Sequence, residues 1–260
     1  MALIERSAIW PWKGDVPPHL PKPDVMPKAF LLPGDPGRVD KAEKVLSDFQ
    51  IIGQNREYRM GTGTYNGVLI GICSTGIGGA STEIAMVELA AMGVRYAVRT
   101  GGMGALADDL NLGDFLIAGR ALANSGVARH YAPEGEFVMA HEEMTKTMNE
   151  AREALGLPGR VGTCVTADGY YRAQGRPSTP GGPAYPSVLD DFMARGADGA
   201  EMEAEVVFAC GGALGMCTSA VMAVHAHRRS NGWLEDYEGT QTNVLRLGAE
   251  AASRAVLAGF

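Results

Sequence analysis

The sequence predicts an α/β fold with a central, largely parallel or mixed sheet, because apolar runs alternate with segments of helical period after residue 27. One βαβ unit is the clearest part of this pattern. It consists of an apolar run at 68–73, a small-residue turn at 74–81, a helical segment at 82–92 and a second apolar run at 94–98. A second glycine-rich turn follows directly. Because open α/β sheets bind ligands at the carboxyl ends of their strands, both turns are candidate ligand sites.

The other elements follow from the same periodicity and from glycine and proline at their ends. The turn at 33–38 is expected to open a helix, which places Arg38 in its first turn, and Asn66-Gly67 is typical of a hairpin turn. Expected strands cover 28–32, 51–65 as an extended pair, 114–118, 160–165, 199–202 and 216–226, and expected helices cover 39–49, 141–155, 187–195, 203–214 and 240–260.

The first 27 residues differ from the rest of the chain. They are rich in proline and contain Trp10 and Trp12, so we expect an extended arm that lies on its own domain or on a neighbouring subunit. Residues 28–260 contain no internal repeat and no clear linker, and their number suits one large α/β domain. The predicted organisation is therefore an N-terminal arm, 1–27, and a single domain, 28–260.

Composition excludes several classes of function. A formal net charge of -7 argues against nucleic acid or an anionic membrane as the main partner. No stretch is apolar for the length of a membrane span, and the N-terminus lacks the pattern of a signal peptide. The four cysteines are far apart and form no CxxC pair, which favours reduced thiols. We therefore expect a cytoplasmic location.

The small-residue turn at 74–81 does not fit a dinucleotide site. The third glycine of GxGxxG would fall at Ser81, and the next strand ends in Arg99 instead of an acidic residue. The sequence also has no Walker GK[ST], HExxH or GxSxG motif. The polar groups at the predicted strand ends suit another ligand: arginines with exposed glycine amides suit phosphate, and a carboxylate suits paired sugar hydroxyls. Gln174 and Arg176 suit the edge of a heterocyclic base, so the residues indicate an enzyme that brings phosphate to a nucleoside-like substrate.

These segments also resemble a known family. The resemblance rests on Pro33-Gly-Asp-Pro-Gly-Arg38, Cys73-Ser-Thr-Gly-Ile-Gly-Gly79, Arg99 with its glycines, His130-Tyr-Ala-Pro133 and Glu201-Met-Glu203. Together they are similar to the nucleoside phosphorylase family in one register from about residue 28 to 229, and Gln174-Gly-Arg176 is similar to its uridine phosphorylase branch. The resemblance implies a single-domain three-layer α/β/α fold, reversible phosphorolysis of a nucleoside, and dimer units assembled as a hexamer with shared active sites.

The resemblance also assigns roles to residues. It implies Arg99, Arg176 and Glu203 as catalytic residues, inorganic phosphate as co-substrate, and no organic cofactor. The phosphate-binding residues would be Gly34, Arg38, Arg56, Arg99 and Gly102, with Arg56 given by the neighbouring subunit; the base-binding residues would be Tyr170, Gln174, Arg176, His225 and Arg228; the ribose-binding residues would be His19, Glu201, Met202 and Glu203, with His19 from the partner's arm. Glu57, Ile77 and Ser81 match a site where some relatives hold a monovalent cation such as K⁺ between subunits.

Three positions depart from the family pattern. Gly102 stands where relatives usually have a hydroxyl residue, and His225 and His227 stand where relatives tend to have apolar or amide side chains. The expected reaction is phosphorolysis of a pyrimidine nucleoside, and uridine is the first expected substrate. The alternatives are a purine nucleoside phosphorylase, a nucleosidase of the same fold, and a nucleoside-binding protein with weak catalysis, which Gly102 would favour.

Overall fold

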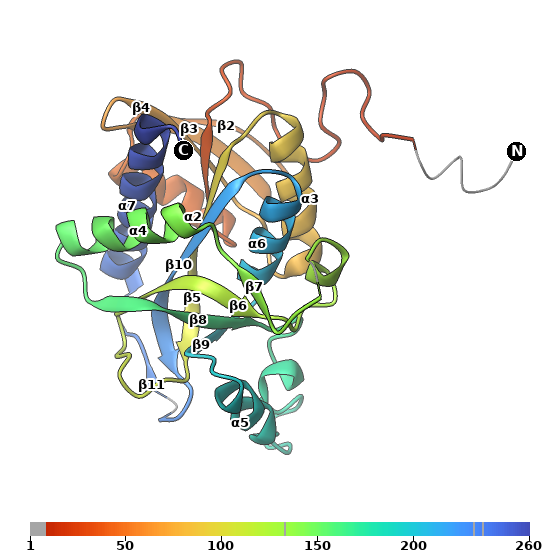
Figure 1. Cartoon of the computed structure of the whole chain (residues 1–260), viewed down its shortest axis with the longest axis vertical. Coiled ribbons are helices and arrows are strands. Elements are labelled where there is room, and N and C mark those ends of the chain that lie inside the picture. Colours follow the sequence, from red (N-terminus) through yellow and green to blue (C-terminus); the bar gives the residue numbers. More distant parts are fainter. Residues whose placement is uncertain (1–8, 133, 231, 236) are drawn as a thin grey trace, which may run out of the picture.

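An eleven-stranded sheet runs through the middle of the molecule (Figure 1). The structure is a computed structural model, and it describes residues 9–132, 134–230, 232–235 and 237–260. The strand order is β11-β10-β6-β8-β9-β5-β1-β4-β3-β2, with β7 paired to β6 and a further pairing between β10 and β5. The sheet is mixed, as predicted.

Parallel pairings form the centre of this sheet. β1 (Ala29–Leu32) lies between β4 (Val68–Cys73) and β5 (Tyr96–Ala105), parallel to both, and β5 continues in parallel along β10 (Cys217–His227). The other parallel pairings join β6 (Phe115–Leu122), β8 (Gly159–Thr166) and β9 (Gly199–Glu201). Antiparallel pairings of β6 with β10 and of β9 with β5 join these two groups. Further antiparallel strands are β2 (Ser47–Asn55), β3 (Tyr58–Tyr65), β7 (Phe137–Met139) and β11 (Gly232–Trp233).

Helices cover both faces of the sheet and complete three layers (Figure 1). α3 (Gly79–Ala91) and α6 (Ala204–Ala213) pack together over one apolar core, which contains Met86, Leu89 and Phe208. α4 (Glu142–Ala154) and α7 (Tyr237–Ala258) pack together over a second core. The predicted α/β/α architecture is therefore confirmed. The short α2 (Pro36–Asp40) and α5 (Ser187–Ala194) lie outside these pairs.

Most predicted elements are present, and the strand at 68–73 has the predicted bounds. The predicted hairpin turn is also confirmed, because Asn66 and Gly67 both have positive φ, 50° and 75°, between β3 and β4. The helix predicted at 39–49 is wrong. Helical backbone continues through the 3-10 turn η1 (Lys41–Lys44) only, because the chain from Ser47 onward pairs with β3.

The second predicted strand of the βαβ unit is much longer than its apolar run. The segment from Arg99 to Ala105 was expected to turn, but it continues β5 without a break. The whole of β5 pairs with β10, from Tyr96 opposite Cys217 to Ala105 opposite His227. Pairing along the whole of β10 holds these glycines in extended backbone, so Arg99 lies within a strand and not at its end.

Hydrogen bonds to Glu88, near the carboxyl end of α3, hold the N-terminal arm at His19 and Leu20. The Glu88 carboxylate, itself buried, accepts hydrogen bonds from the backbone N–H groups of His19 and Leu20 at 3.1 and 2.8 Å, and it contacts the His19 Nδ1 at 2.6 Å. The first eight residues of the predicted arm, and Pro133 of the predicted His-Tyr-Ala-Pro motif, lie outside the described residues. Among the described helices, none has the length and apolarity needed to cross a bilayer. All four thiols are buried and unpaired.

Candidate active site

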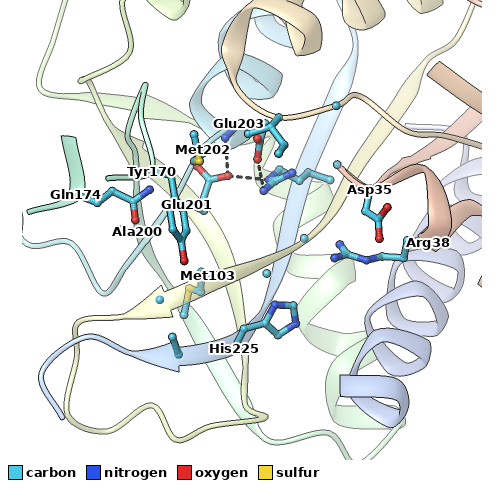
Figure 2. A pocket seen from close by; sticks show the side chains of 18 of the residues that line it. Asp35, Arg38, Met103, Tyr170, Gln174, Ala200, Glu201, Met202, Glu203 and His225 are labelled. Atoms are coloured by element: carbon cyan, nitrogen blue, oxygen red, sulfur yellow. Dashed lines mark hydrogen bonds and ion pairs between the residues drawn. The ribbon is translucent and has the colours of Figure 1, made fainter. Parts of the chain in front are cut away.

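A cavity of about 790 Å³ opens along β5 and β10. Its walls come from the loop before α2, the loop between β4 and α3, the junction of β9 with α6, and the 167–186 loop. Figure 2 shows the side chains that line it. We call the part around Arg38, Arg99 and Glu203 the sheet end, and the part around Tyr170, Gln174 and Arg176 the loop end.

The glycines of β5 make room for the site. A Cβ atom on Gly101 would lie 2.8 Å from the Arg99 guanidinium carbon, and one on Gly104 would lie 2.8 Å from Cγ of Arg228. A Cβ atom on Gly102 would lie only 2.1 Å from the Nδ1 of His225. These distances are too short for real contacts, so each glycine provides the space in which one nitrogen-rich side chain of the site lies.

Arg99 is the central cation of the sheet end. It is 4% exposed, and its Nε contacts the Glu201 carboxylate at 2.7 Å while its Nη2 contacts Glu203 at 2.5 Å (Figure 2). Burial works against the charged guanidinium, but Glu203 and Glu201 outweigh burial and raise the pKa of Arg99. The two carboxylates therefore fix both the charge and the orientation of this cation.

Glu201 organises the protein around Arg99. The same oxygen that contacts Arg99 also accepts the backbone N–H groups of Glu203 and Ala204, at 2.8 and 2.9 Å, and so satisfies amides at the start of α6. Its other oxygen accepts the hydroxyl of Thr166 at the end of β8. With its side chain fully buried and both oxygens engaged, Glu201 connects β5, β8 and α6.

Glu203 lies at the boundary between this network and the cavity. One carboxylate oxygen accepts the backbone N–H of Gly78 at 2.6 Å, and the other contacts Arg99. Gly78 has a φ of 93°, a conformation that glycine adopts without strain. The small-residue turn between β4 and α3 thus positions a carboxylate, which explains why that turn is rich in glycine.

Arg38 provides the second cation of the sheet end. Asp35 begins α2 by accepting the Gly37 N–H at 2.9 Å, and Arg38 then donates to the Thr100 carbonyl on β5 at 3.0 Å. Burial, and the nearby charge of Arg99, lower the pKa of Arg38. Its Nε is buried and has no hydrogen-bond partner within the described parts of the chain. Arg38 and Arg99 are two neighbouring cations, and Nε of Arg38 is a free hydrogen-bond donor among the described residues. This arrangement favours the binding of an anion.

The loop end is built from a short 3-10 turn, η3 (Arg172–Gln174), in the 167–186 segment. The Gln174 side-chain oxygen accepts from Arg176 at 2.8 Å and from Arg228 at 3.3 Å. Arg176 also donates to the Tyr170 carbonyl at 2.7 Å and lies 4.0 Å above the Tyr170 ring. Burial and the neighbouring Arg176 lower the pKa of Arg228 to about 10. A planar group with carbonyl oxygens would find several donors here.

Most of the residues predicted for the site meet in this cavity. Lining residues among them are Gly34, Arg38, Arg99, Gly102, Tyr170, Gln174, Arg176, Glu201, Met202, Glu203 and His225, and Arg228 joins them through Gln174. Two others lie elsewhere: His19 contacts Glu88 on α3, and Arg56 lies exposed in the turn between β2 and β3, with a φ of 53°. Both had been expected to act in a neighbouring subunit's site.

The residues matched to a cation site also lie close together. A Cβ atom on Gly76 would lie 2.8 Å from Cγ of Glu57 and 3.1 Å from the Ser81 hydroxyl, so Glu57 and Ser81 both lie beside Gly76 in the β4–α3 turn, where Ile77 is the next residue. Glu57 and Ile77 also line the cavity rim, and Ile77 is 81% exposed.

Sequence reasoning missed several residues of the site. Trp233 on β11 and Tyr237 at the start of α7 line the cavity, and the Tyr237 ring lies 5.0 Å from His225. No local pattern marks either residue: the pairing of β11 with β10 places Trp233 beside the cavity, and Tyr237 lies at the start of α7. Thr166 was not among the predicted site residues, yet its hydroxyl contacts Glu201 and accepts the Glu205 N–H at 2.9 Å.

Comparison with known proteins fits this geometry. Residues 28–258 match the family model described as the phosphorylase superfamily. A uridine phosphorylase of Thermococcus kodakarensis is 37% identical over 214 residues, which cover 81% of this chain and 76% of the relative. A guanosine phosphorylase of Halorubrum lacusprofundi is 33% identical over 195 residues, or 75% and 76% of the two chains.

A solved structure shares the fold. The crystal structure of a uridine phosphorylase from Vibrio fischeri superposes with a TM-score of 0.78 at 24% identity, over 93% of this chain and 96% of that one. A uridine phosphorylase of Haemophilus influenzae is 34% identical over 76% of this chain and 80% of the relative. The motifs of the βαβ unit, the cavity that they build and these likenesses lead to one conclusion: the chain belongs to the phosphorylase superfamily, beside its uridine phosphorylases.

Proposed function

We propose that this protein catalyses the reversible phosphorolysis of a pyrimidine nucleoside, uridine first, to the free base and ribose 1-phosphate. The observation that carries the proposal is that one cavity has arginines at both of its ends. Arg38 and Arg99 crowd the sheet end, and Arg176 with Gln174 marks the loop end. The sugar would lie between them, against Met202 and Glu203. The names of its relatives, two uridine phosphorylases, support the same reaction.

The sheet end would hold phosphate beneath the sugar. Arg38 has a buried donor without a partner among the described residues, Arg99 is held by two carboxylates, and Gly34 and Gly102 line the cavity there. Cleavage of a glycosidic bond gives the ribose cationic character, which a bound phosphate dianion stabilises before it attacks the anomeric carbon. Phosphate is thus the nucleophile, and the mechanism requires no covalent bond to a protein side chain.

The loop end would stabilise the leaving base. As the glycosidic bond breaks, negative charge develops on the uracil ring and its carbonyl oxygens. Arg176 is half-buried and already oriented by Tyr170 and Gln174, so its guanidinium can stabilise that charge with little reorganisation. Tyr170 would pack on the ring, and Arg228 would fix Gln174.

Glu203 and Glu201 would have different roles at the ribose. Glu203 has one oxygen on a backbone N–H and the other on Arg99, and it lines the cavity where the sugar hydroxyls would lie. Glu201 has its oxygens engaged by Arg99, Thr166 and the amides of α6. We therefore assign hydroxyl binding to Glu203 and infer that Glu201 acts through Arg99, as a positioning residue.

The remaining proposals concern the domain organisation and the assembly of subunits. We propose an arm at 1–27 and one domain at 28–260, in dimer units that form a hexamer. Arg56 and His19 lie outside their own chain's cavity, which suits residues that complete a neighbouring site. Glu57, Ile77 and Ser81 would hold a monovalent cation at that interface, with oxygens of Glu57 and Ser81 as donors. A cytoplasmic location and a role in pyrimidine salvage fit this activity.

A purine nucleoside is the second candidate, because one relative bears the name guanosine phosphorylase. Purine recognition favours a carboxylate near the ring nitrogens. The described side chains at the loop end are Gln174, Arg176, Arg228 and Tyr170, which offer donors and an aromatic face but no carboxylate. This chemistry favours a pyrimidine with two carbonyl groups.

The experiment is incubation with uridine, thymidine and inosine, each with and without inorganic phosphate. We expect release of uracil from uridine that depends on phosphate. Release without phosphate would indicate a nucleosidase, preferential cleavage of inosine would indicate a purine enzyme, and binding without turnover would indicate a binding protein.

A further inference from the structure

His225 occupies the space that a side chain on residue 102 would need. The nearest atoms to a Cβ on Gly102 would be the Nδ1 and Cε1 of His225, at 2.1 and 2.3 Å. Any residue larger than glycine at 102 would therefore displace the imidazole. Two of the departures from the family pattern, Gly102 and His225, thus form one feature: β10 supplies an imidazole where β5 would otherwise supply a side chain.

The imidazole lies at the sheet end of the cavity. Figure 2 shows His225 below β5, with its ring toward Arg38. Burial and the charge of Arg38 lower the pKa of His225 to about 4, so the ring is neutral at neutral pH and carries one N–H. Tyr237 packs edge-on against the ring. Its Nε2 is buried and has no hydrogen-bond partner in the described part of the chain.

These contacts change the role first expected for His225, which was base binding. Its neighbours include Gly102 and Arg38, both assigned to phosphate, and Arg38 itself has a buried donor that no described group satisfies. An unpartnered buried nitrogen beside such a cation loses free energy unless a ligand satisfies it. A phosphate oxygen would satisfy the donors of both residues.

We propose that His225 is a phosphate-binding residue, whose Nε2–H donates to a phosphate oxygen from the place that a side chain on residue 102 would occupy. The proposal rests on the proposed phosphorolysis. It makes Gly102 a residue that admits the imidazole, and it replaces a hydroxyl from β5 with a nitrogen donor from β10.

The test is a set of four variants with phosphate and uridine varied separately: His225→Ala, His225→Gln, Gly102→Thr, and the double variant His225→Ala/Gly102→Thr. Loss of a hydrogen bond to a charged group corresponds to roughly tenfold or more in affinity, so His225→Ala should raise the KM for phosphate by that factor and the KM for uridine by less than about threefold. His225→Gln keeps a donor near Nε2 and should recover most of the loss. Gly102→Thr alone should weaken the binding of phosphate strongly, because the threonine side chain displaces the imidazole.

The double variant decides whether the two positions are coupled. Removing the imidazole gives the threonine space, so the double variant should bind phosphate better than Gly102→Thr alone, and the two changes should be non-additive. An unchanged KM for phosphate in His225→Ala would overturn the proposal, and so would a selective rise in the KM for uridine or strictly additive effects. Circular dichroism would verify that each variant is folded.

A second measurement separates this proposal from the function on which it depends. Inorganic phosphate alone should raise the melting temperature of the wild-type protein, and His225→Ala should need about tenfold more phosphate for the same shift. A wild-type protein that binds phosphate without cleaving uridine would refute the proposed reaction but leave the role of His225 measurable. Equal phosphate-induced shifts in both proteins would refute that role.

Discussion

The sheet end of the cavity is part of the folded core, whereas the loop end is attached to it. Arg99, Glu201 and Glu203 are buried and joined to β5, β8 and α6 by hydrogen bonds and ion pairs. At the loop end, Tyr170 is 42% exposed and Arg176 is held by two contacts within its own segment. The difference indicates that changes at the sheet end alter folding and function together, while changes at the loop end alter function alone.

The largest effect is expected for Arg99→Ala. The substitution leaves Glu201 and Glu203 buried without their cation, which typically costs about 3–5 kcal/mol in the free energy of unfolding. Turnover should fall by about a thousandfold or more, because the cation that we propose to bind phosphate is lost at the same time. Urea unfolding and initial rates would measure both effects.

Arg254→Ala is the matched control for that variant. Arg254 pairs with Glu250 on α7, at a partly exposed position, and its loss should cost less than about 1 kcal/mol. If Arg99→Ala were no less stable than Arg254→Ala, the sheet end would not be part of the folded core.

The second effect is expected for Arg176→Ala, which should lower uridine turnover by roughly a hundredfold to a thousandfold with little change in melting temperature. Arg176 would lose its stabilisation of the leaving base, yet its contacts lie within one loop. The control is Arg172→Ala in the same loop, where the arginine lies 4.5 Å over Tyr185. Parallel losses of stability and activity in Arg176→Ala would contradict the comparison.

The third effect concerns pH. The pKa of His225 is lowered to about 4 in the folded protein, whereas an unfolded histidine titrates near 6.5. Between these values the unfolded chain binds more protons, so this histidine lowers stability as the pH falls from about 6.5 to 4, by on the order of 2 kcal/mol. Urea unfolding across that range should give a steeper loss for the wild-type protein than for His225→Gln. Equal slopes would show that the histidine is not held neutral.

The smallest effect is expected for Tyr170→Ala. Stacking of a base on an aromatic ring is worth about 1–3 kcal/mol, so the KM for uridine should rise by roughly tenfold while the KM for phosphate changes little. Tyr171→Ala is the control, because Tyr171 is more exposed and does not line the cavity. A similar rise in both variants would mean that the loop, and not the ring, binds the base.

Sequence patterns predicted most of the fold because the signals involved are local. The apolar run at 68–73 and the Asn66-Gly67 turn appear as predicted. The errors occurred where partners far along the chain decide the conformation. Glycines after Arg99 indicated a turn, but pairing with β10 makes them strand, and pairing with β3 ends the helix predicted at 39–49.

For the candidate site too, local motifs predicted some features and tertiary packing determined the others. Arg38, Arg99, Glu203 and Arg176 were predicted from motifs, and the structure brings them into one cavity. The engagement of Glu201 and the place of His225 over Gly102 required coordinates, because a bulge in the pairing of β10 with β5 near Val224 sets how His225 meets β5. Sequence therefore indicated most of the side chains that meet in the cavity, and the packing shows how each of them is held there.

The most direct test of the account is to follow the sugar product. Phosphorus NMR of a reaction with uridine and inorganic phosphate should reveal one ribose 1-phosphate for each uracil released, with a rate that saturates in phosphate. Release of uracil with free ribose, at a rate independent of phosphate, would contradict the role given to Arg38 and Arg99 at the sheet end.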